Sequence, residues 1–231
     1  MRLKSRLKRI ARPFLETAGI DWLSRPSLEG LDRKLEKHLD IDRGFFVEAG
    51  ANDGWRQSNT YYFERLRKWR GILVEGIPEL YEACRRQRPG SRVYNCALVD
   101  DDHRAPTVTM RYGNLMSVVE GSMKTAEAQQ AHLANAVAWQ PGTRVYTVEV
   151  PARTLGSILA EAPDLPPIDL LSLDVEGYEL SVLRGMQIER FTPRYVVVEA
   201  RFFDEVDAFL SRTHRQVEQL SGHDYLYAAR A

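Results

Sequence analysis

Glu48-Ala49-Gly50-Ala51-Asn52-Asp53-Gly54 is the stretch of sequence that decides the fold of this chain. It follows Phe45-Phe46-Val47, a short apolar run of the kind that forms a buried strand. Gly50 allows the backbone to turn sharply and to approach a ligand closely, and Gly54 does the same where the next helix begins. In an open parallel sheet, ligands bind beyond the carboxyl ends of the strands. The stretch therefore predicts a ligand-binding turn between a strand and a helix.

The glycine spacing indicates which kind of ligand the turn holds. A dinucleotide site uses Gly-x-Gly-x-x-Gly and keeps acidic residues away from the pyrophosphate. Here three residues separate Gly50 from Gly54, and the strand ends in an acid, Glu48, whose carboxylate can meet a cationic amine. The turn thus suits an amino-acid or sulfonium-bearing ligand better than NAD. The alternative is a tight turn that binds nothing.

Glu75 ends a second apolar strand, residues 71–75, roughly 20 residues after Gly54. A carboxylate there can accept both hydroxyls of an adenosine ribose, and the alternative is a solvated residue at the rim of the sheet. An amino-acid end at the turn and a ribose at Glu75 together predict S-adenosylmethionine (SAM). Every residue from Glu48 to Gly54 is then a predicted cofactor-binding residue. So are Gly76 and three residues of the third strand, 93–98, that would flank the adenine: Cys96, Ala97 and Leu98.

The rest of the chain alternates strands and helices, which argues for a parallel sheet covered by helices. The prediction is an α/β, Rossmann-like class I SAM-methyltransferase fold with a mainly parallel seven-stranded sheet. Strands near 215–220 and 225–229, separated by Ser221-Gly222-His223-Asp224, predict an antiparallel C-terminal hairpin.

Residues 100–150 break this alternation. Strands at 108–112 and 145–150 flank a Gly/Asn/Ser-rich stretch at 113–122 and an Ala-rich helix near 123–138. We interpret this part as an insertion over one edge of the sheet, on the substrate side. The predicted domains are an N-terminal helical appendage at 1–43 and the methyltransferase domain at 44–231.

Acidic residues form a second cluster at strand ends. Asp174-Val175-Glu176-Gly177 follows the strand 169–173, and Glu199 ends the strand 195–199, so Asp174 and Glu199 are expected side by side. Three uses are open for these candidate catalytic residues: a general base for a hydroxyl, a Mg²⁺ or Mn²⁺ site at Asp174 and Glu199, or hydrogen bonds to substrate hydroxyls. Asp174 is also expected to contact the cofactor. The structural alternative is a salt bridge to Arg201, Arg184 or Arg153.

Together these motifs resemble the FkbM family of SAM-dependent methyltransferases over roughly residues 44–230. The resemblance rests on Glu48–Gly54, the strand 72–75, Asp174–Gly177 with Glu179 and Leu183-Arg184-Gly185 behind it, and Val196–Glu199. It implies methylation of a hydroxyl oxygen on a sugar, oligosaccharide or polysaccharide precursor. The alternatives are O-methylation of a polyketide or another small natural product, a methyltransferase with another kind of acceptor, and a non-catalytic SAM-binding module.

The resemblance also implies roles for polar residues outside the strand ends. Ser58 and Thr60 would bind the methionine carboxylate, and the stretch 113–122, with Asn114, Ser117 and Ser122, would face the acceptor. His132 lies on the predicted inserted helix, from which it can approach the substrate.

Composition narrows the choice of partners. The chain has 231 residues and a formal net charge of zero, so nucleic acid is not an expected partner. The two cysteines form no Cys-x-x-Cys pair, which argues against a disulfide framework or a zinc site. No apolar run reaches about 18 residues, so we expect no transmembrane span. Without a signal-peptide pattern, the predicted compartment is the cytoplasm. A homodimer is compatible with the sequence.

The N-terminus carries apolar residues at helical spacing among basic ones over 1–16. Pro13 is expected to end or kink this helix. It is either a lid packed on the domain or a weak contact with an anionic membrane surface or a partner. A second helix is predicted at 27–39.

Overall fold

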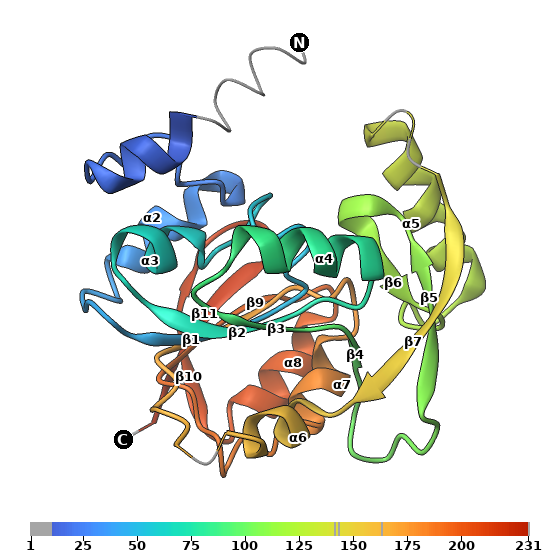
Figure 1. Cartoon of the computed structure of the whole chain (residues 1–231). Helices are drawn as coiled ribbons and strands as arrows, with labels where there is room; N and C mark the ends of the chain where they lie inside the picture. Colours follow the sequence, from blue (N-terminus) through green and yellow to red (C-terminus); the bar gives the residue numbers. More distant parts are fainter. Residues whose placement is uncertain (1–10, 141, 143, 163, 231) are drawn as a thin grey trace.

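The computed structural model describes residues 11–140, 142, 144–162 and 164–230. A seven-stranded sheet in the order β10-β11-β9-β8-β1-β2-β3 lies at its centre (Figure 1). The strands are β1 Phe45–Ala49, β2 Arg70–Val74, β3 Arg92–Tyr94, β8 Leu170–Leu173, β9 Tyr195–Glu199, β10 His214–Gln219 and β11 Asp224–Ala229. The run from β3 to β9 is parallel, and β11 pairs antiparallel with β9 and β10. The predicted fold class, with its C-terminal hairpin, is confirmed.

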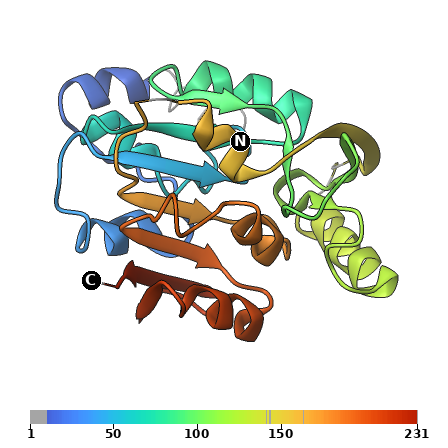
Figure 2. The same ribbon diagram turned by 90° about the horizontal axis from the view of Figure 1, so that it is seen from below.

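Helices cover both faces of this sheet (Figures 1 and 2). One face carries η1 Leu28–Gly30, α2 Leu31–Glu36, α3 Tyr61–Leu66 and α4 Pro78–Gln87, and the other carries α6 Leu155–Ala160, α7 Glu179–Arg184 and α8 Phe203–Leu210. Neighbouring residues of a strand point to opposite faces, so Phe46 packs in the α3-side core and Val47 in the α7-side core. Burial on both faces explains why residues 45–47 of β1 and 71–74 of β2 are apolar runs rather than alternating ones.

The order of the strands reverses at β1. Ala49 at its end pairs with Val74 of β2 on one side and with Leu173 of β8 on the other. The chain leaves β1 toward α3 and leaves β8 toward α7, which lie on opposite faces of the sheet. Such a switch point opens a crevice beyond the strand ends, where Gly50 and Asp174 meet.

The inserted part of the chain forms a second sheet, in the order β4-β7-β5-β6, beside the end of the first one (Figure 2). Its elements are β4 Ala97–Leu98, β5 Thr107–Tyr112, η2 Asn114–Met116, β6 Val118–Val119, α5 Ala126–Trp139 and β7 Tyr146–Arg153. The single strand predicted at 93–98 is wrong, because it is divided between the two sheets. At the break, the Asn95 side-chain amide donates to the carbonyls of Glu75 and Gly76, each at 2.9 Å, and the chain turns toward β7.

The N-terminal segment departs from the prediction at Pro13. Residues 11–17 are helical, so Pro13 does not end the helix, and residues 1–10 of the predicted basic helix lie outside the described residues. Pro13 is exposed, its carbonyl accepts the Thr17 hydroxyl at 2.9 Å, and the backbone reverses only at Gly19, whose φ is +74°. None of the helices within the described ranges is long and apolar enough to span a membrane.

Residues 31–39 of the predicted helix 27–39 contribute to the main core, whereas Leu28, before the break at Glu29, is 48% exposed. Leu31, Leu35 and Leu39 are buried in one cluster with Phe46 of β1 and Leu73 of β2. The predicted domain boundary near residue 43 stays a prediction. The residues before and after this boundary pack in the same core cluster.

Candidate functional site

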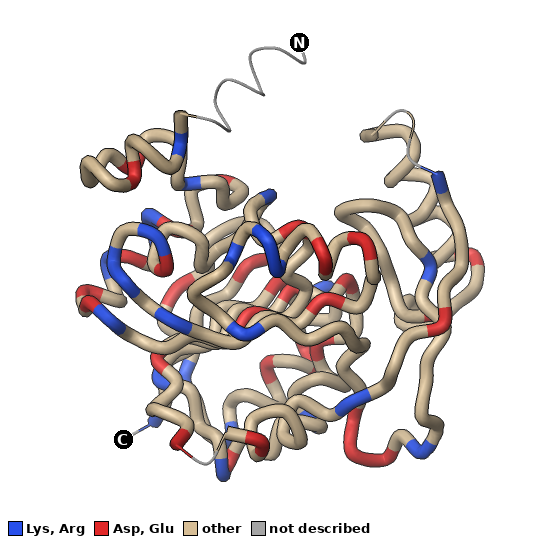
Figure 3. The backbone as a smooth tube through the Cα atoms, in the orientation of Figure 1, with Lys and Arg blue, Asp and Glu red and all other residues tan. Residues whose placement is uncertain are grey.

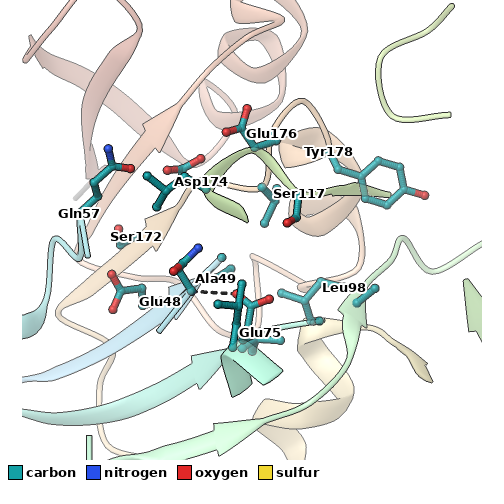
Figure 4. Close-up of a pocket in the computed structure, with 18 of the residues that line it drawn as sticks. Glu48, Ala49, Gln57, Glu75, Leu98, Ser117, Ser172, Asp174, Glu176 and Tyr178 are labelled. Carbon is teal, nitrogen blue, oxygen red and sulfur yellow. Dashed lines mark hydrogen bonds between the residues drawn. The ribbon is translucent and has the colours of Figure 1, made fainter. Parts of the chain in front are cut away.

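A cavity lies beyond the carboxyl ends of β1, β2 and β8 and holds about 890 Å³ of empty space, partly open to solvent (Figure 4). Most residues predicted for the site line it: Glu48, Ala49, Gly50, Asn52, Ser58, Glu75, Gly76, Cys96, Ala97, Leu98, Asn114, Ser117, Asp174 and Glu176. Sequence reasoning missed Asn59, Ser172 and Tyr178, which line it as well. The predicted residues Ala51, Asp53, Gly54, His132 and Glu199 are not on its wall.

Three residues of the glycine turn therefore need a correction, because they shape the turn instead of facing the cavity. Ala51 is buried in the α3-side core. The Asp53 carboxylate accepts the backbone N–H groups of Trp55 and Arg56, at 3.0 and 2.8 Å. Gly54 packs on α4, where a Cβ atom would stand 3.0 Å from the Cα of Cys84.

Gly50 is required by the protein itself. Its φ is +84°, and a Cβ atom added there would stand 1.8 Å from the backbone oxygen of Asp174. The turn after β1 and the end of β8 thus touch through their backbones, which only glycine permits. The sequence predicted that the Gly50 backbone approaches a ligand closely. In the structure, its closest approach is to the backbone at the end of β8.

Glu75 is held at the cavity wall by the turn. Its carboxylate oxygens accept the backbone N–H groups of Asn52 and Ile77, each at 2.8 Å. Burial raises the pKa of Glu75 to about 7, and these hydrogen bonds oppose that rise. A carboxylate oxygen can accept more than one hydrogen bond, so both oxygens can still receive a ligand hydroxyl. Beside Glu75 lies an apolar slot lined by Leu80, Cys96, Ala97, Leu98, Met110 and Val119.

Glu48 differs from the sequence expectation because its carboxylate is already occupied. It accepts the hydroxyls of Ser58 and Thr60, at 3.0 and 2.6 Å, and the backbone N–H of Asn59, at 3.2 Å. Arg88, whose side chain is fully buried, pairs with it at 3.2 Å. Glu48 therefore orders residues 58–60, and the Ser58 and Thr60 hydroxyls donate to Glu48 rather than to a ligand carboxylate.

Arg88 is the central residue that sequence reasoning missed. Its guanidinium also pairs with Glu64 at 2.8 Å and donates to the carbonyl of Gly54 at 3.2 Å. It directly follows the predicted helix 78–87, a position that is usually exposed to solvent. No local pattern marks such a buried charge, since its partners come from other parts of the chain.

Asn59 offers the cavity a side-chain acceptor. Its side-chain amide donates to the Ser172 hydroxyl at 3.2 Å. Its side-chain oxygen is buried and has no hydrogen-bond partner among the residues that the structure describes. A ligand with N–H donors would satisfy that oxygen. The signal in the sequence was the polar cluster 58–60, of which Asn59 is the middle residue.

Carboxylates gather at the ends of β8 and β9. Burial and the neighbouring Glu199 and Glu176 raise the pKa of Asp174 well above its usual value. Burial and Glu199 raise the pKa of Glu176 to about 7, against the opposing effect of Arg201. Glu199 is half-buried beside the cavity, and burial raises its pKa too. The pairing of like charges disfavours their simultaneous ionisation, so this edge of the cavity favours a cation.

The inserted part of the chain closes on this carboxylate cluster through His132. Glu176 pairs with Arg201 at 3.1 Å and lies 3.6 Å from His132 of α5. Burial lowers the pKa of His132. This buried side chain connects α5 to the loop that carries Glu176. Ser122 also contacts this loop, through the Glu176 carbonyl at 3.5 Å, and is not among the residues lining the cavity. Of the three arginines proposed as salt-bridge partners, Arg201 has that role toward Glu176.

The predicted Mg²⁺ or Mn²⁺ site at Asp174 and Glu199 finds no support in the geometry. Within the described ranges, no group of three or more His, Cys, Asp or Glu residues is arranged to hold a metal ion. Glu179, which is close in sequence, instead accepts the backbone N–H groups of Val175 and Gly177, at 3.3 and 2.8 Å, and so stabilises the loop.

Two curated proteins resemble this chain in sequence. "Methyltransferase 1" of Beauveria bassiana (strain ARSEF 2860) is 27% identical over 68% of this chain and 66% of its own length. "Methyltransferase sdnD" of Sordaria araneosa is 30% identical over 67% of this chain and 65% of its own length. The chain thus spans just under two thirds of the length of these curated relatives.

Solved structures resemble the chain more distantly. A methyltransferase from Geobacter sulfurreducens aligns at 14% identity and a TM-score of 0.47, over 100% of this chain and 88% of that one. A TehB-like SAM-dependent methyltransferase from Corynebacterium glutamicum aligns at 11% identity and a TM-score of 0.44, over the whole of both chains. The sequence model of the methyltransferase FkbM domain matches residues 48–227, and the chain therefore belongs to the FkbM methyltransferase family.

Proposed function

We propose that this chain transfers a methyl group from SAM to a hydroxyl oxygen of a small polar acceptor, a sugar or oligosaccharide hydroxyl. One observation carries the proposal: a single cavity places a strand-end carboxylate suited to ribose, Glu75, opposite a carboxylate suited to proton transfer, Asp174. The family supports the methyl transfer, and the acceptor is inferred from the cavity wall.

The cavity suits a positively charged ligand. SAM, when bound, supplies an electrophilic methyl group on a positively charged sulfur. Glu75, Asp174 and Glu176 line the cavity, while Arg56 is the one cationic side chain among its described lining residues. The Glu48 charge is balanced by Arg88, which leaves the unpartnered Asn59 oxygen as an acceptor for an ammonium group. A pyrophosphate would meet carboxylates instead of donors here, which argues against a dinucleotide.

Asp174 is the proposed proton acceptor. Burial and the neighbouring carboxylates raise the pKa of Asp174, which makes it a stronger proton acceptor, and a bound cation beside it favours its ionised form. As the new C–O bond forms and the C–S bond breaks, the hydroxyl proton moves to Asp174. This transfer also relieves the repulsion between Asp174, Glu176 and Glu199, because one of the three charges disappears.

The acceptor side of the cavity supports a polyhydroxylated molecule. Asn114 and Ser117 of the inserted part line it together with Tyr178, which follows the acidic loop (Figure 4). Ser117 accepts the Gly113 N–H and donates to the Asn114 carbonyl, which fixes its orientation. Amide, hydroxyl and aromatic groups of this kind bind sugar hydroxyls and ring faces.

Two variants separate cofactor binding from chemistry. Glu75→Gln should weaken SAM binding about tenfold or more, because one carboxylate hydrogen bond is worth roughly 1.5–3 kcal/mol. Asp174→Asn should bind SAM and yet lower kcat about 10²- to 10⁴-fold, the usual contribution of a general base. The measurements are calorimetric SAM titration and transfer of labelled methyl groups from SAM to a panel of mono- and oligosaccharides.

Asp102→Asn is the matched control, since the Asp102 side chain is 96% exposed and lies away from the cavity. It should match the wild type in both assays. Turnover by Asp174→Asn at the wild-type rate would show that Asp174 is not the base. Binding of SAM without methyl transfer to any sugar would exclude sugars as the acceptor class.

A further inference from the structure

A second groove lies between the N-terminal segment and the turn 53–56, next to the cofactor cavity. It holds about 2220 Å³ of empty space, partly open to solvent. One wall is formed by residues 12–26, and the other by the turn, α3 and the end of α4 (Figure 1). Its charged lining residues are strongly unbalanced, with a single carboxylate, Asp53, among those described, against Arg12, Arg25, Arg56, Arg65 and Arg86. Figure 3 shows basic residues along the N-terminal segment and along the facing part of the chain around α3 and α4.

Carboxylates outside the groove hold these arginines in place. Glu16 accepts from Arg65 at 2.8 Å and forms an ion pair with Arg12, whose Nε lies 3.8 Å from it. Glu36 accepts from Arg25 at 2.7 Å, and Asp21 pairs with the same guanidinium. A guanidinium carries five N–H donors in a rigid plane, so one or two ion pairs leave further donors for a ligand. The groove therefore presents fixed cationic groups instead of mobile surface arginines.

Three buried donors of residues that line this groove have no acceptor within hydrogen-bond distance among the described residues. Arg12 Nε, Arg25 Nη1 and Trp55 Nε1 are covered from solvent and lack a hydrogen-bond partner in the part of the chain that the structure describes. The Arg12 and Arg25 side chains are only 10% and 8% exposed. The Arg12 guanidinium stands 4.9 Å from the ring centroids of both Trp55 and Tyr61. A buried unsatisfied donor costs about 1–3 kcal/mol, so three in one groove indicate a ligand that supplies acceptors.

We propose that this groove binds a phosphate ester, with Arg12, Arg25 and Trp55 donating to the phosphate oxygens. A phosphate group carries several strong acceptor oxygens and matches the planar fork of arginine. The three nitrogens are covered, so binding requires the Arg12 guanidinium to turn out from between the rings of Trp55 and Tyr61. It also requires the Arg25 guanidinium, which lies 3.5 Å over the ring of Tyr62, to shift toward the groove. Arg86, at the outer edge of α4, adds charge attraction from the solvent side.

The position of the groove connects it to the acceptor. Arg56 lines both this groove and the cofactor cavity. A sugar phosphate held by its phosphate in the groove extends its hydroxyls toward the cavity past Arg56. This second step, that the methyl acceptor is a phosphorylated sugar, rests on the proposed function, whereas phosphate-ester binding in the groove does not.

Calorimetry on the full chain tests the binding, with glucose 1-phosphate, inorganic phosphate and glucose as separate probes. We expect glucose 1-phosphate to bind, inorganic phosphate to bind more weakly and glucose to give no heat. Arg12→Gln should weaken glucose 1-phosphate binding about tenfold, the equivalent of one charge-assisted hydrogen bond. Arg86→Gln should weaken it about threefold and reduce its dependence on salt.

Arg85→Gln is the matched control, because Arg85 and Arg86 both pair with Glu82 on α4 and only Arg86 lines the groove. It should bind glucose 1-phosphate like the wild type. Trp55→Phe, which keeps an aromatic ring but removes the N–H, replaces Arg12→Gln if that variant does not fold.

Wild-type affinity in Arg86→Gln and in either Arg12→Gln or Trp55→Phe would overturn the site, and so would equal binding of glucose and glucose 1-phosphate. These readouts use no methyl transfer. Failure of the groove is therefore distinguishable from failure of the proposed methyltransferase activity.

Discussion

Gly50 carries the strictest requirement of any single residue in the site, because two backbones meet there. Gly50→Ala places a methyl group 1.8 Å from the Asp174 carbonyl. We expect the variant to lose more than about 4 kcal/mol of stability or to fail to fold, since a backbone clash adds to the cost of a positive φ. Urea unfolding measures this loss.

Gly121 offers a control with nearly the same backbone. Its φ is +87°, against +84° at Gly50, and nothing stands within 4 Å of an added Cβ atom. Gly121→Ala should cost only the conformational penalty, about 1–2 kcal/mol. Equal losses in the two variants would show that the contact with Asp174 is not what requires Gly50.

At the scale of elements, the end of α4 organises the strand-to-helix connection after β1. Arg88 joins Glu48 of β1, Glu64 of α3 and the carbonyl of Gly54 in one buried cluster. Removal of one partner of a buried ion pair leaves an uncompensated charge and costs about 3–5 kcal/mol. Arg88→Met should therefore lower the free energy of unfolding by that amount and weaken SAM binding, as measured by denaturant titration and calorimetry.

Arg85→Met on the exposed side of the same helix should cost about 0–1 kcal/mol, the usual range for a surface pair. Adding Glu64→Gln to Arg88→Met should restore part of the loss, because Glu64 no longer stays buried without its partner. If the double variant loses as much free energy of unfolding as the two single variants together, Arg88 and Glu64 do not form the buried pair described above.

Across the whole molecule, carboxylates with raised pKa values link stability to pH. Burial raises the pKa values of Glu75 and Glu179 to about 7, from an ordinary value of 4.5. The folded state then holds protons that the unfolded state releases. The stability that these protons contribute is fully present below pH 4.5 and is lost as pH rises through 7. Each group contributes at most about 3 kcal/mol.

We therefore expect the melting temperature of the ligand-free protein to fall between pH 5.5 and pH 8 (a window of roughly one to two units around these pKa values). SAM should flatten that slope, because its positive charge stabilises the ionised carboxylates. Glu179→Gln should reduce the slope, while the 67% exposed Glu189 supplies a control, Glu189→Gln, that leaves it unchanged. A melting temperature that rises over this window would contradict the burial of these carboxylates.

Short-range rules account for most of what could be predicted. The glycine turn, the strand-end Glu75, the helix 78–87 and the C-terminal hairpin depend on residues within a few positions of each other, where backbone geometry and apolar periodicity act. The division of the strand 93–98 could not be predicted in this way. It depends on the Asn95 side chain reaching carbonyls of residues 75 and 76, about 20 positions earlier.

The sequence by itself determined the fold class, the edge of the sheet that holds the site and most of the residues on the cavity wall. Only the tertiary structure decided which charges remain available there. Arg88 neutralises Glu48, Arg201 pairs with Glu176, and Asp174 has no ion-pair partner among the residues that the structure describes. The physical reason is that backbone conformation follows from neighbours along the chain, whereas the charge state of a buried group follows from whatever the fold places against it.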